Sequence, residues 1–397
     1  MADLRFEPVV LKWAREKRFG PKMEILLANW VESWKEVTPD LIKEWENGIA
    51  QPTFAQVRKL AEIYKRPLAV FFLDGPPKEK KDPPDLRTIN SEDNKLLSPA
   101  ALLAIRKARR VQEVSADLHE ELGERPFFKY ARHSLDENAS ELAENIRADL
   151  LISANEQFGF KKYEDFFEYL RNKIESAGVI TLKSGLHDSF PITDCRAFSF
   201  ADQQPYLVFV NNKDTEGAKN FSLAHEFAHV LLREAGICNN FKSFSGHKNG
   251  INKLEVFCNQ FAASFLVPEA EFLKHRTLKD KTKISPEDLD SKIERIAFDF
   301  KVSRVVILRR LLTFNYVTSA IYEAKTKKWD GEPRPNGKKG GRFSLKTILS
   351  KNGVGFSSLV FEAYKQKKIP YSGISDYLGL KMKHLPGLEK LIHSHAR

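Results

Sequence analysis

Cysteine is scarce in this chain of 397 residues, and its placement argues against two kinds of site. The three cysteines are Cys195, Cys238 and Cys258. An odd number of cysteines without Cys-x-x-Cys spacing is typical neither of a disulfide framework nor of a structural four-cysteine zinc site. The sequence therefore predicts a protein of a reducing compartment, the cytoplasm.

Long hydrophobic runs are also missing. No window approaches 18 consecutive apolar residues, and the N-terminal stretch MADLRFEPVVLKWAREKRFG has scattered charges in place of the apolar core of a signal peptide. With 42% hydrophobic and 11% aromatic residues, the chain can nevertheless bury the cores of two or three domains. We expect a globular, soluble protein with no membrane partner.

A net charge is missing from most of the chain. Residues 325–397 hold 16 of the 64 Lys and Arg residues but 5 of the 53 Asp and Glu residues, so residues 1–324 balance at 48 of each sign. The whole excess of +11 therefore lies in the last fifth of the chain. A basic segment of this kind contacts nucleic acid or an acidic protein, or forms a solvated surface that keeps the protein soluble.

The N-terminal region reads as a bundle of short helices of the helix-turn-helix type. MEILLANWVESW continues an apolar stripe, Thr38-Pro39 predicts the start of a helix that Asn47-Gly48 ends, and Thr53 is placed to cap the next helix. The four prolines and the charges of DGPPKEKKDPPD, residues 74–85, then mark a domain boundary.

The remainder predicts mainly α structure with a small β-sheet, an α+β fold. Helical periodicity predicts helices over 100–123, 139–152, 163–178, 254–267, 286–300 and 303–314. Short runs rich in β-branched and aromatic residues predict strands over 178–182, 195–200 and 205–211, immediately before the stretch FSLAHEFAHVLL. Residues 325–342, rich in glycine, proline and lysine, predict a mobile linker to a C-terminal segment of two or three short helices.

FSLAHEFAHVLL carries the chemistry. His225 and His229 are four residues apart, so on a helix both imidazoles lie on one face and can bind one ion. A catalytic zinc site has three protein ligands and an open position for water, from which Glu226, beside the first ligand, can accept a proton. The pattern predicts a hydrolytic zinc centre with Glu226 as general base.

The third ligand is expected on the next helix. Glu234 lies too close to the two histidines on the same helix to turn back towards them, whereas Glu255 begins LEVFCNQFAASFLV, a helix with small residues on one side. Glu255 is therefore the predicted ligand, and Cys258, one turn further on, is a softer alternative that we interpret as packing.

The sequence leaves two questions about this site open: how a substrate binds, and which residue stabilises a tetrahedral intermediate. A strand, CRAFSF or PYLVFV, could accept an extended peptide at a sheet edge or pair entirely within its own sheet. The candidates for stabilising a tetrahedral intermediate are His187, Arg196, Tyr206 and His247.

These motifs resemble the ImmA/IrrE-type zinc metallopeptidases, in the form fused to an N-terminal XRE-type helix-turn-helix domain. NFSLAHEFAHVLL and EVFCNQFAASFLVP resemble the peptidase core, PTFAQVRKLAEIYKRPLAVFFLDGPP the end of the XRE domain, and GFSSLVFEAYKQKKIPYSGISDYLGL the C-terminal helices. The resemblance implies that His225, His229 and Glu255 hold zinc and that Glu226 is the general base. It implies an XRE-like domain over 1–74, a linker over 75–99, a zincin-like peptidase domain over 100–324, a basic linker over 325–342 and a helical segment over 343–397.

The resemblance further implies cleavage of a specific regulatory protein, such as a transcriptional repressor, in a stress or mobile-element response. The alternative is a DNA-binding regulator or an antitoxin that neutralises a cognate toxin, with a structural or sensory zinc site. In the presumed recognition helix, Pro39, Asp40 and Glu44 stand beside a single Lys43. Because acidic side chains facing phosphates weaken DNA binding, partner binding or homodimerisation competes with DNA binding for this domain.

Overall fold

The chain forms two compact units, residues 1–103 and 104–397. The computed structural model describes residues 5–19, 37–64, 66–77, 97–185, 190–234, 236–238, 253–278, 288–330 and 344–395. The predicted stripe MEILLANWVESW and most of the proline-rich boundary lie outside these residues. None of the described helices is both long and apolar enough to span a bilayer.

The first unit is a small helical bundle. Its elements are α1 (Pro8–Phe19), α3 (Pro39–Glu46), α4 (Phe54–Tyr64) and the 3-10 helix η1 (Leu68–Phe72). Their buried faces form one core around Trp45, Leu60 and Phe71. The bundle is thus held together by helix faces that the apolar spacing of the sequence provides.

The caps in this unit lie where the sequence predicts them. The Thr38 hydroxyl accepts a hydrogen bond from the Leu41 N–H at 3.2 Å, with Pro39 at the start of α3. Gly48 follows the end of α3 with φ of +72°, a conformation that favours glycine. Thr53 and Gln56 cap α4 reciprocally, each side chain accepting from the other's backbone N–H.

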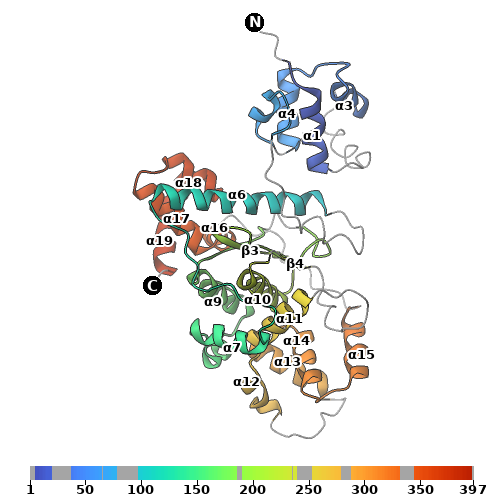
Figure 1. The fold of residues 1–397 in the computed structure, drawn as a ribbon, viewed down its shortest axis with the longest axis vertical. Helices are drawn as coiled ribbons and strands as arrows, with labels where there is room; N and C mark the ends of the chain where they lie inside the picture. Colours follow the sequence, from blue (N-terminus) through green and yellow to red (C-terminus); the bar gives the residue numbers. More distant parts are fainter. Residues whose placement is uncertain are drawn as a thin grey trace. The chain divides into compact units, whose positions relative to one another are not determined.

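The second unit is mainly α with one small mixed sheet, as the sequence predicts (Figure 1). Before and around the sheet it contains α6 (Pro99–Glu121) from Ala104 onward, α7 (Ala139–Asp149), α8 (Ala154–Gly159), α9 (Tyr163–Ser176) and α10 (Glu216–Leu232). After the sheet come α11 (Lys253–Leu266), α12 (Glu269–Leu273), η3 (Arg276–Leu278), α13 (Leu289–Phe300), α14 (Arg304–Thr313), α15 (Ser319–Asp330), α16 (Leu345–Asn352), α17 (Val354–Lys365), α18 (Tyr371–Leu378), η4 (Met382–His384) and α19 (Leu385–His395).

The sheet has the strand order β1-β3-β2-β4. The predicted strands are present as β1 (Val179–Lys183), β2 (Ala197–Phe200) and β3 (Tyr206–Val210), with β1 parallel and β2 antiparallel to β3. The sequence does not predict the fourth strand, β4 (Gly236–Cys238), which follows α10 and pairs with β2. Three residues are too short a run for a strand pattern to be read from sequence.

Helices cover both faces of this sheet. Ser199 of β2 reaches α10 on one face, while the neighbouring Phe200 lies under the Arg109 guanidinium of α6, 3.9 Å from the ring centroid, on the other. Figure 1 shows α6 and α10 on opposite sides of the strands. This explains why the strands read as continuous apolar runs, since both of their faces are buried.

The C-terminal helices belong to the second unit. Glu168 of α9 accepts a hydrogen bond from the Ser350 hydroxyl at 2.9 Å, and Glu175 accepts one from the Gly355 N–H at 2.9 Å. Between them the fully buried Arg171 bonds to the backbone of Ser350. Charge-assisted bonds of this kind fix α16 and α17 against α9.

The prediction of a linker over 325–342 is wrong for its first six residues. Residues 325–330 continue α15, because Trp329 is buried with its ring 4.7 Å from the Arg304 guanidinium, and Lys325 forms an ion pair with Asp290 at 2.7 Å. Packing thus overrides the lysine-rich composition of KTKKWD. Residues 331–343 lie outside the described part of the chain.

Close packing at the start of α10 leaves no room for a side chain at Gly217. A Cβ at this position would lie 2.7 Å from the Val302 carbonyl carbon and 2.8 Å from the Ser303 nitrogen, both backbone atoms. We expect Gly217→Ala to lower the free energy of unfolding by about 1–3 kcal/mol in urea denaturation. Gly159→Ala, where a Cβ meets nothing within 4 Å, is the control and should change it little; equal effects would contradict the close contact.

Candidate metal centre

Helix α10 carries the predicted motif and is buried on all sides. It begins at Glu216, five residues before the stretch that suggested it, and every residue from Gly217 to Leu232 is buried. It packs against β2 and β3 on one side and against α9 and α11 on the others. A helix in such a position must be largely apolar around its circumference, as FSLAHEFAHVLL is apart from Ser222 and its ionisable residues.

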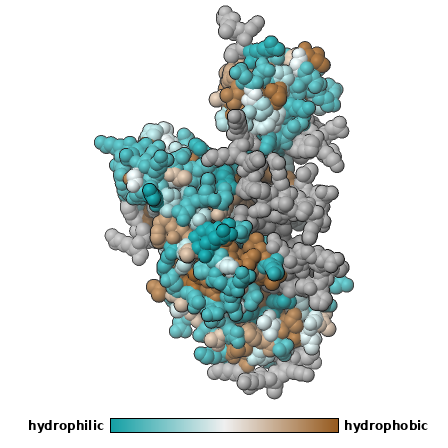
Figure 2. All heavy atoms as spheres, in the orientation of Figure 1, coloured by the Kyte–Doolittle hydropathy of each residue, from teal (hydrophilic) through white to brown (hydrophobic). Residues whose placement is uncertain are grey.

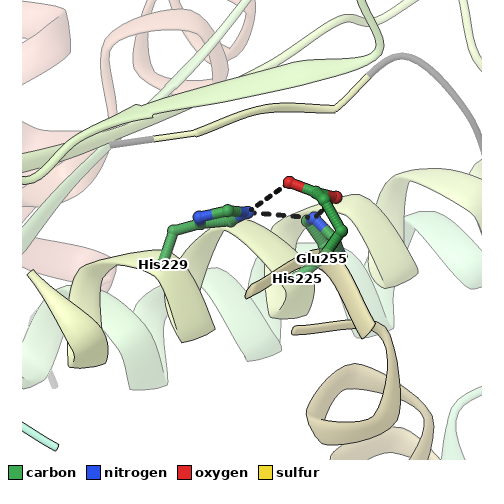
Figure 3. A group of neighbouring side chains, drawn as sticks. All are labelled: His225, His229 and Glu255. Atoms are coloured by element: carbon green, nitrogen blue, oxygen red, sulfur yellow. Dashed lines mark hydrogen bonds and ion pairs between the residues drawn. The ribbon is translucent and has the colours of Figure 1, made fainter. Parts of the chain in front are cut away.

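Three side chains from two helices meet at one point (Figure 3). His225 and His229 of α10 direct their Nε2 atoms towards each other at 3.2 Å. Glu255, in the first turn of α11, places Oε2 3.3 Å from the His225 Nε2 and Oε1 3.3 Å from the His229 Nε2. The structure thus brings together the three residues that the sequence nominates as ligands.

The spacing of these atoms fits a small divalent ion. Ligands around tetrahedral zinc, each at about 2.0–2.1 Å from the metal, lie about 3.3 Å from one another. The distances between the two nitrogens and the carboxylate oxygens are 3.2–3.3 Å. Two imidazoles and one carboxylate also form a donor set that suits zinc and several other transition metals.

The charges at this point favour a cation. Burial alone would raise the pKa of the Glu255 carboxyl, but the hydrogen bonds and charges of His225 and His229 hold it well below its usual range. Burial alone would lower the pKa of His229, but Cys258 and the carboxylates of Glu255 and Glu226 raise it well above its usual range. A positive charge is therefore stabilised here, and a bound metal ion would supply it.

Glu226 lies next to the cluster with one oxygen held and one available. Its Oε2 accepts a hydrogen bond from the Ser199 hydroxyl of β2 at 2.7 Å. Its Oε1 is buried and has no hydrogen-bond partner within the described part of the chain. Burial raises the pKa of this carboxyl, although the two histidines and Ser199 favour the ionised form. A raised pKa brings a carboxylate closer to the range in which it can exchange protons at neutral pH.

Ser199 is the residue at this site that sequence reasoning missed. It is one serine within a run of buried apolar residues, AFSF, and nothing local distinguishes it from a packing residue. Its position opposite Glu226 depends on how β2 lies against α10. The available signal was the isolated hydroxyl in a doubly buried strand, because such a group needs a partner.

Cys258 lies beside His229 but outside the three-ligand cluster. Burial raises the pKa of its thiol, although the neighbouring His229 lowers it. This arrangement agrees with the interpretation of Cys258 as a packing residue on the face of α11 that meets α10.

The two described candidates for stabilising an oxyanion, Tyr206 and Arg196, contact other side chains. Tyr206 packs edge-on against Phe128, and the Arg233 guanidinium lies 4.6 Å from its ring. Arg196 forms an ion pair with Asp214 at 2.6 Å. His187 and His247 lie outside the described residues.

Comparison with known proteins bears on the same segment. Residues 186–312 match the model of a peptidase family, M78, described as the IrrE N-terminal-like domain. The match supports the resemblance of this segment to the ImmA/IrrE peptidase family. Its range contains β2, β3, α10 and α11, and with them Glu226 and the three clustered residues. No curated protein and no solved structure matches the chain. The match supports a peptidase activity, and peptidases of this family are typically metal-dependent.

Metal binding is testable on the purified protein. We expect about one zinc ion per chain by elemental analysis after dialysis, and severe loss of the metal in His229→Ala and Glu255→Ala, because two ligands hold zinc poorly. His133→Ala, which removes a histidine paired with Glu137 outside the cluster, should keep the metal. Metal retained by both ligand variants would contradict the assignment.

The bond from Ser199 to Glu226 should be measurable as stability. Ser199→Ala leaves a buried carboxylate without its hydrogen bond, so we expect the metal-free protein to lose about 1.5–3 kcal/mol of unfolding free energy in urea. Ser357→Ala is the matched control, because that buried hydroxyl donates to the neutral carbonyl of Gly353. A loss no larger than that of the control would contradict a charged acceptor.

Proposed function

We propose that this protein is a zinc-dependent endopeptidase that cleaves a specific regulatory protein, such as a transcriptional repressor, in a stress or mobile-element response. The observation that carries the proposal is the convergence of His225, His229 and Glu255 at 3.2–3.3 Å, with the free oxygen of Glu226 beside them. The match to a peptidase family over the same residues supports it.

The side chains have distinct roles in this proposal. His225, His229 and Glu255 would hold the ion, which when bound would polarise the scissile carbonyl and lower the pKa of water. Glu226 would take up the proton of the attacking water at Oε1 and pass it to the leaving amine. Ser199 keeps the other oxygen in place, so that the carboxylate presents a single oxygen to the reaction.

The access route is on the side of Glu255. The two histidine side chains are fully buried, whereas the Glu255 side chain is 30% exposed. Strand β4 ends the sheet order next to β2, which carries Ser199. We propose that an extended segment of the substrate pairs along this end of the sheet, because added strands present backbone carbonyls at regular positions.

The first unit would select the partner. We propose that it is an XRE-like helix-turn-helix module, which the capped helices α3 and α4 support. Exposed Asp40 and Lys43 pair with each other at 3.5 Å on α3, which leaves this helix with little positive charge for phosphates. We therefore favour protein binding or homodimerisation over DNA binding for this unit. A DNA-binding regulator or an antitoxin, bound to a cognate toxin, is the second candidate.

Glu226→Gln separates the two candidates. The substitution removes the base but none of the three ligands, so we expect full metal content and a loss of cleavage of about 10²-fold or more. Cleavage can be followed by incubating the purified protein with the regulatory proteins encoded beside it and analysing the products by mass spectrometry. Ser264→Ala, which removes a hydroxyl bonded to Ser140, is the control and should cleave normally.

Two results would contradict a hydrolytic role. The first is cleavage by Glu226→Gln at the rate of the unsubstituted protein. The second is a partner that binds tightly and is never cut, with binding unchanged in Glu226→Gln, which would favour the regulator or antitoxin.

A further inference from the structure

The connection between α17 and α18 gathers lysines and tyrosines at the surface. We name it the tyrosine–lysine turn and define it as Tyr364, Lys365, Lys367, Lys368 and Tyr371. The Lys367 N–H donates to the Tyr364 carbonyl at 2.9 Å, and the Lys368 N–H donates to the Ala363 carbonyl at 2.8 Å. The chain therefore folds back over the end of α17, and both lysines are held close to Tyr364.

The two tyrosine rings lie side by side at this surface. Their centroids are 5.8 Å apart with an angle of 52° between the ring planes, and each residue is 37% exposed. Ile369, between them in sequence, is buried. The connection thus buries the aliphatic side chain of Ile369 and leaves the two aromatic rings at the surface.

The charge around these rings is positive and mostly unneutralised. Lys365 pairs with Glu389 at 3.3 Å, but within the described residues Lys367 and Lys368 have no carboxylate within 4.0 Å. Residues 344–395 contain eight lysines and three acidic residues. Figure 2 shows mostly hydrophilic residues at the upper left, where Figure 1 places α17 and α18.

The acidic groups of the neighbouring helices are engaged with other partners. Glu168 and Glu175 of α9 accept hydrogen bonds from α16 and the start of α17, and Glu168 also binds Lys183. Beside the turn itself, Glu362 of α17 accepts a hydrogen bond from the Gln366 side chain at 2.9 Å, and Glu389 of α19 pairs with Lys365. The side chains of Lys367 and Lys368 are therefore available to an external anion.

We propose that the tyrosine–lysine turn binds single-stranded nucleic acid. Lysines neutralise backbone phosphates, and an exposed aromatic ring stacks on a base of any sequence. A lysine at the end of a helix stabilises the helix dipole, which accounts for Lys365 but not for the exposed ring pair. A bilayer would gain no insertion of an aliphatic side chain from this turn, because Ile369 is buried.

This surface is separate from the metal centre and goes beyond the proposed peptidase activity. It lies on α17 and α18, whereas the clustered ligands lie on α10 and α11. Binding should therefore be the same in the metal-loaded and chelator-treated protein. Single-stranded DNA and RNA share the phosphates and base faces that the turn would contact, so both are tested.

Fluorescence anisotropy of the full chain with labelled oligo(dT) and oligo(U) of about 15 nucleotides tests the proposal. We expect the double substitution Lys367→Gln and Lys368→Gln to weaken binding about tenfold and to reduce the slope of log affinity against log salt by about 1.4. Tyr364→Ala should weaken binding about fivefold or more, while Tyr364→Phe keeps the ring and should bind normally.

The matched control is the double substitution Lys327→Gln and Lys328→Gln, which removes two adjacent exposed lysines from α15. It should leave affinity and salt slope nearly unchanged. Absence of binding to both oligonucleotides at about 50 mM salt would overturn the proposal. So would unchanged binding in the variants of the turn, an equal loss in the control, or binding to anionic phospholipid vesicles without binding to either oligonucleotide.

Discussion

Helix α10 is buried along its whole length and yet carries two histidines and a glutamate, and this constraint governs the rest of the second unit. Ionisable groups cannot be buried without partners, because the cost of leaving them unpaired exceeds the stability of most domains. Two of the neighbouring elements supply these partners. Helix α11 brings Glu255 to both imidazoles, and β2 brings Ser199 to Glu226. The arrangement also stabilises a positive charge between these side chains, and a bound metal ion would supply it.

The same arrangement gives the site a rigid part, formed by the buried helix α10, and an open part at the surface. The imidazoles are fixed on a helix that sheet and helices enclose, while the carboxylate of Glu255 reaches the surface. Ligands held by a packed framework keep their geometry when a substrate arrives. The C-terminal helices extend this framework, since they are bonded to α9, which packs directly against α10.

Much of the site was predictable because its signals are local or depend on one helix face. The four-residue spacing of His225 and His229 places them together on any helix, and Glu255 follows from the face that small residues leave free. The contact of Ser199 with Glu226 was not predictable, because it depends on how a strand 27 residues earlier in the chain lies against α10. The strand β4 and the helical start of the predicted linker were missed for the related reason that tertiary contacts, such as the burial of Trp329, decide them. The bonds that join α16 and α17 to α9 span about 180 residues, beyond the reach of any sequence pattern.

We propose that two histidines and one carboxylate, without sulfur, form the metal site. X-ray absorption spectroscopy of the zinc-loaded protein measures this shell directly. The structure predicts nitrogen and oxygen scatterers alone at about 2.0–2.1 Å, with the outer-shell signature of two imidazoles. A sulfur scatterer at about 2.3 Å would show that Cys258 is a ligand, and a shell without imidazole would place the metal elsewhere; either result would contradict this assignment.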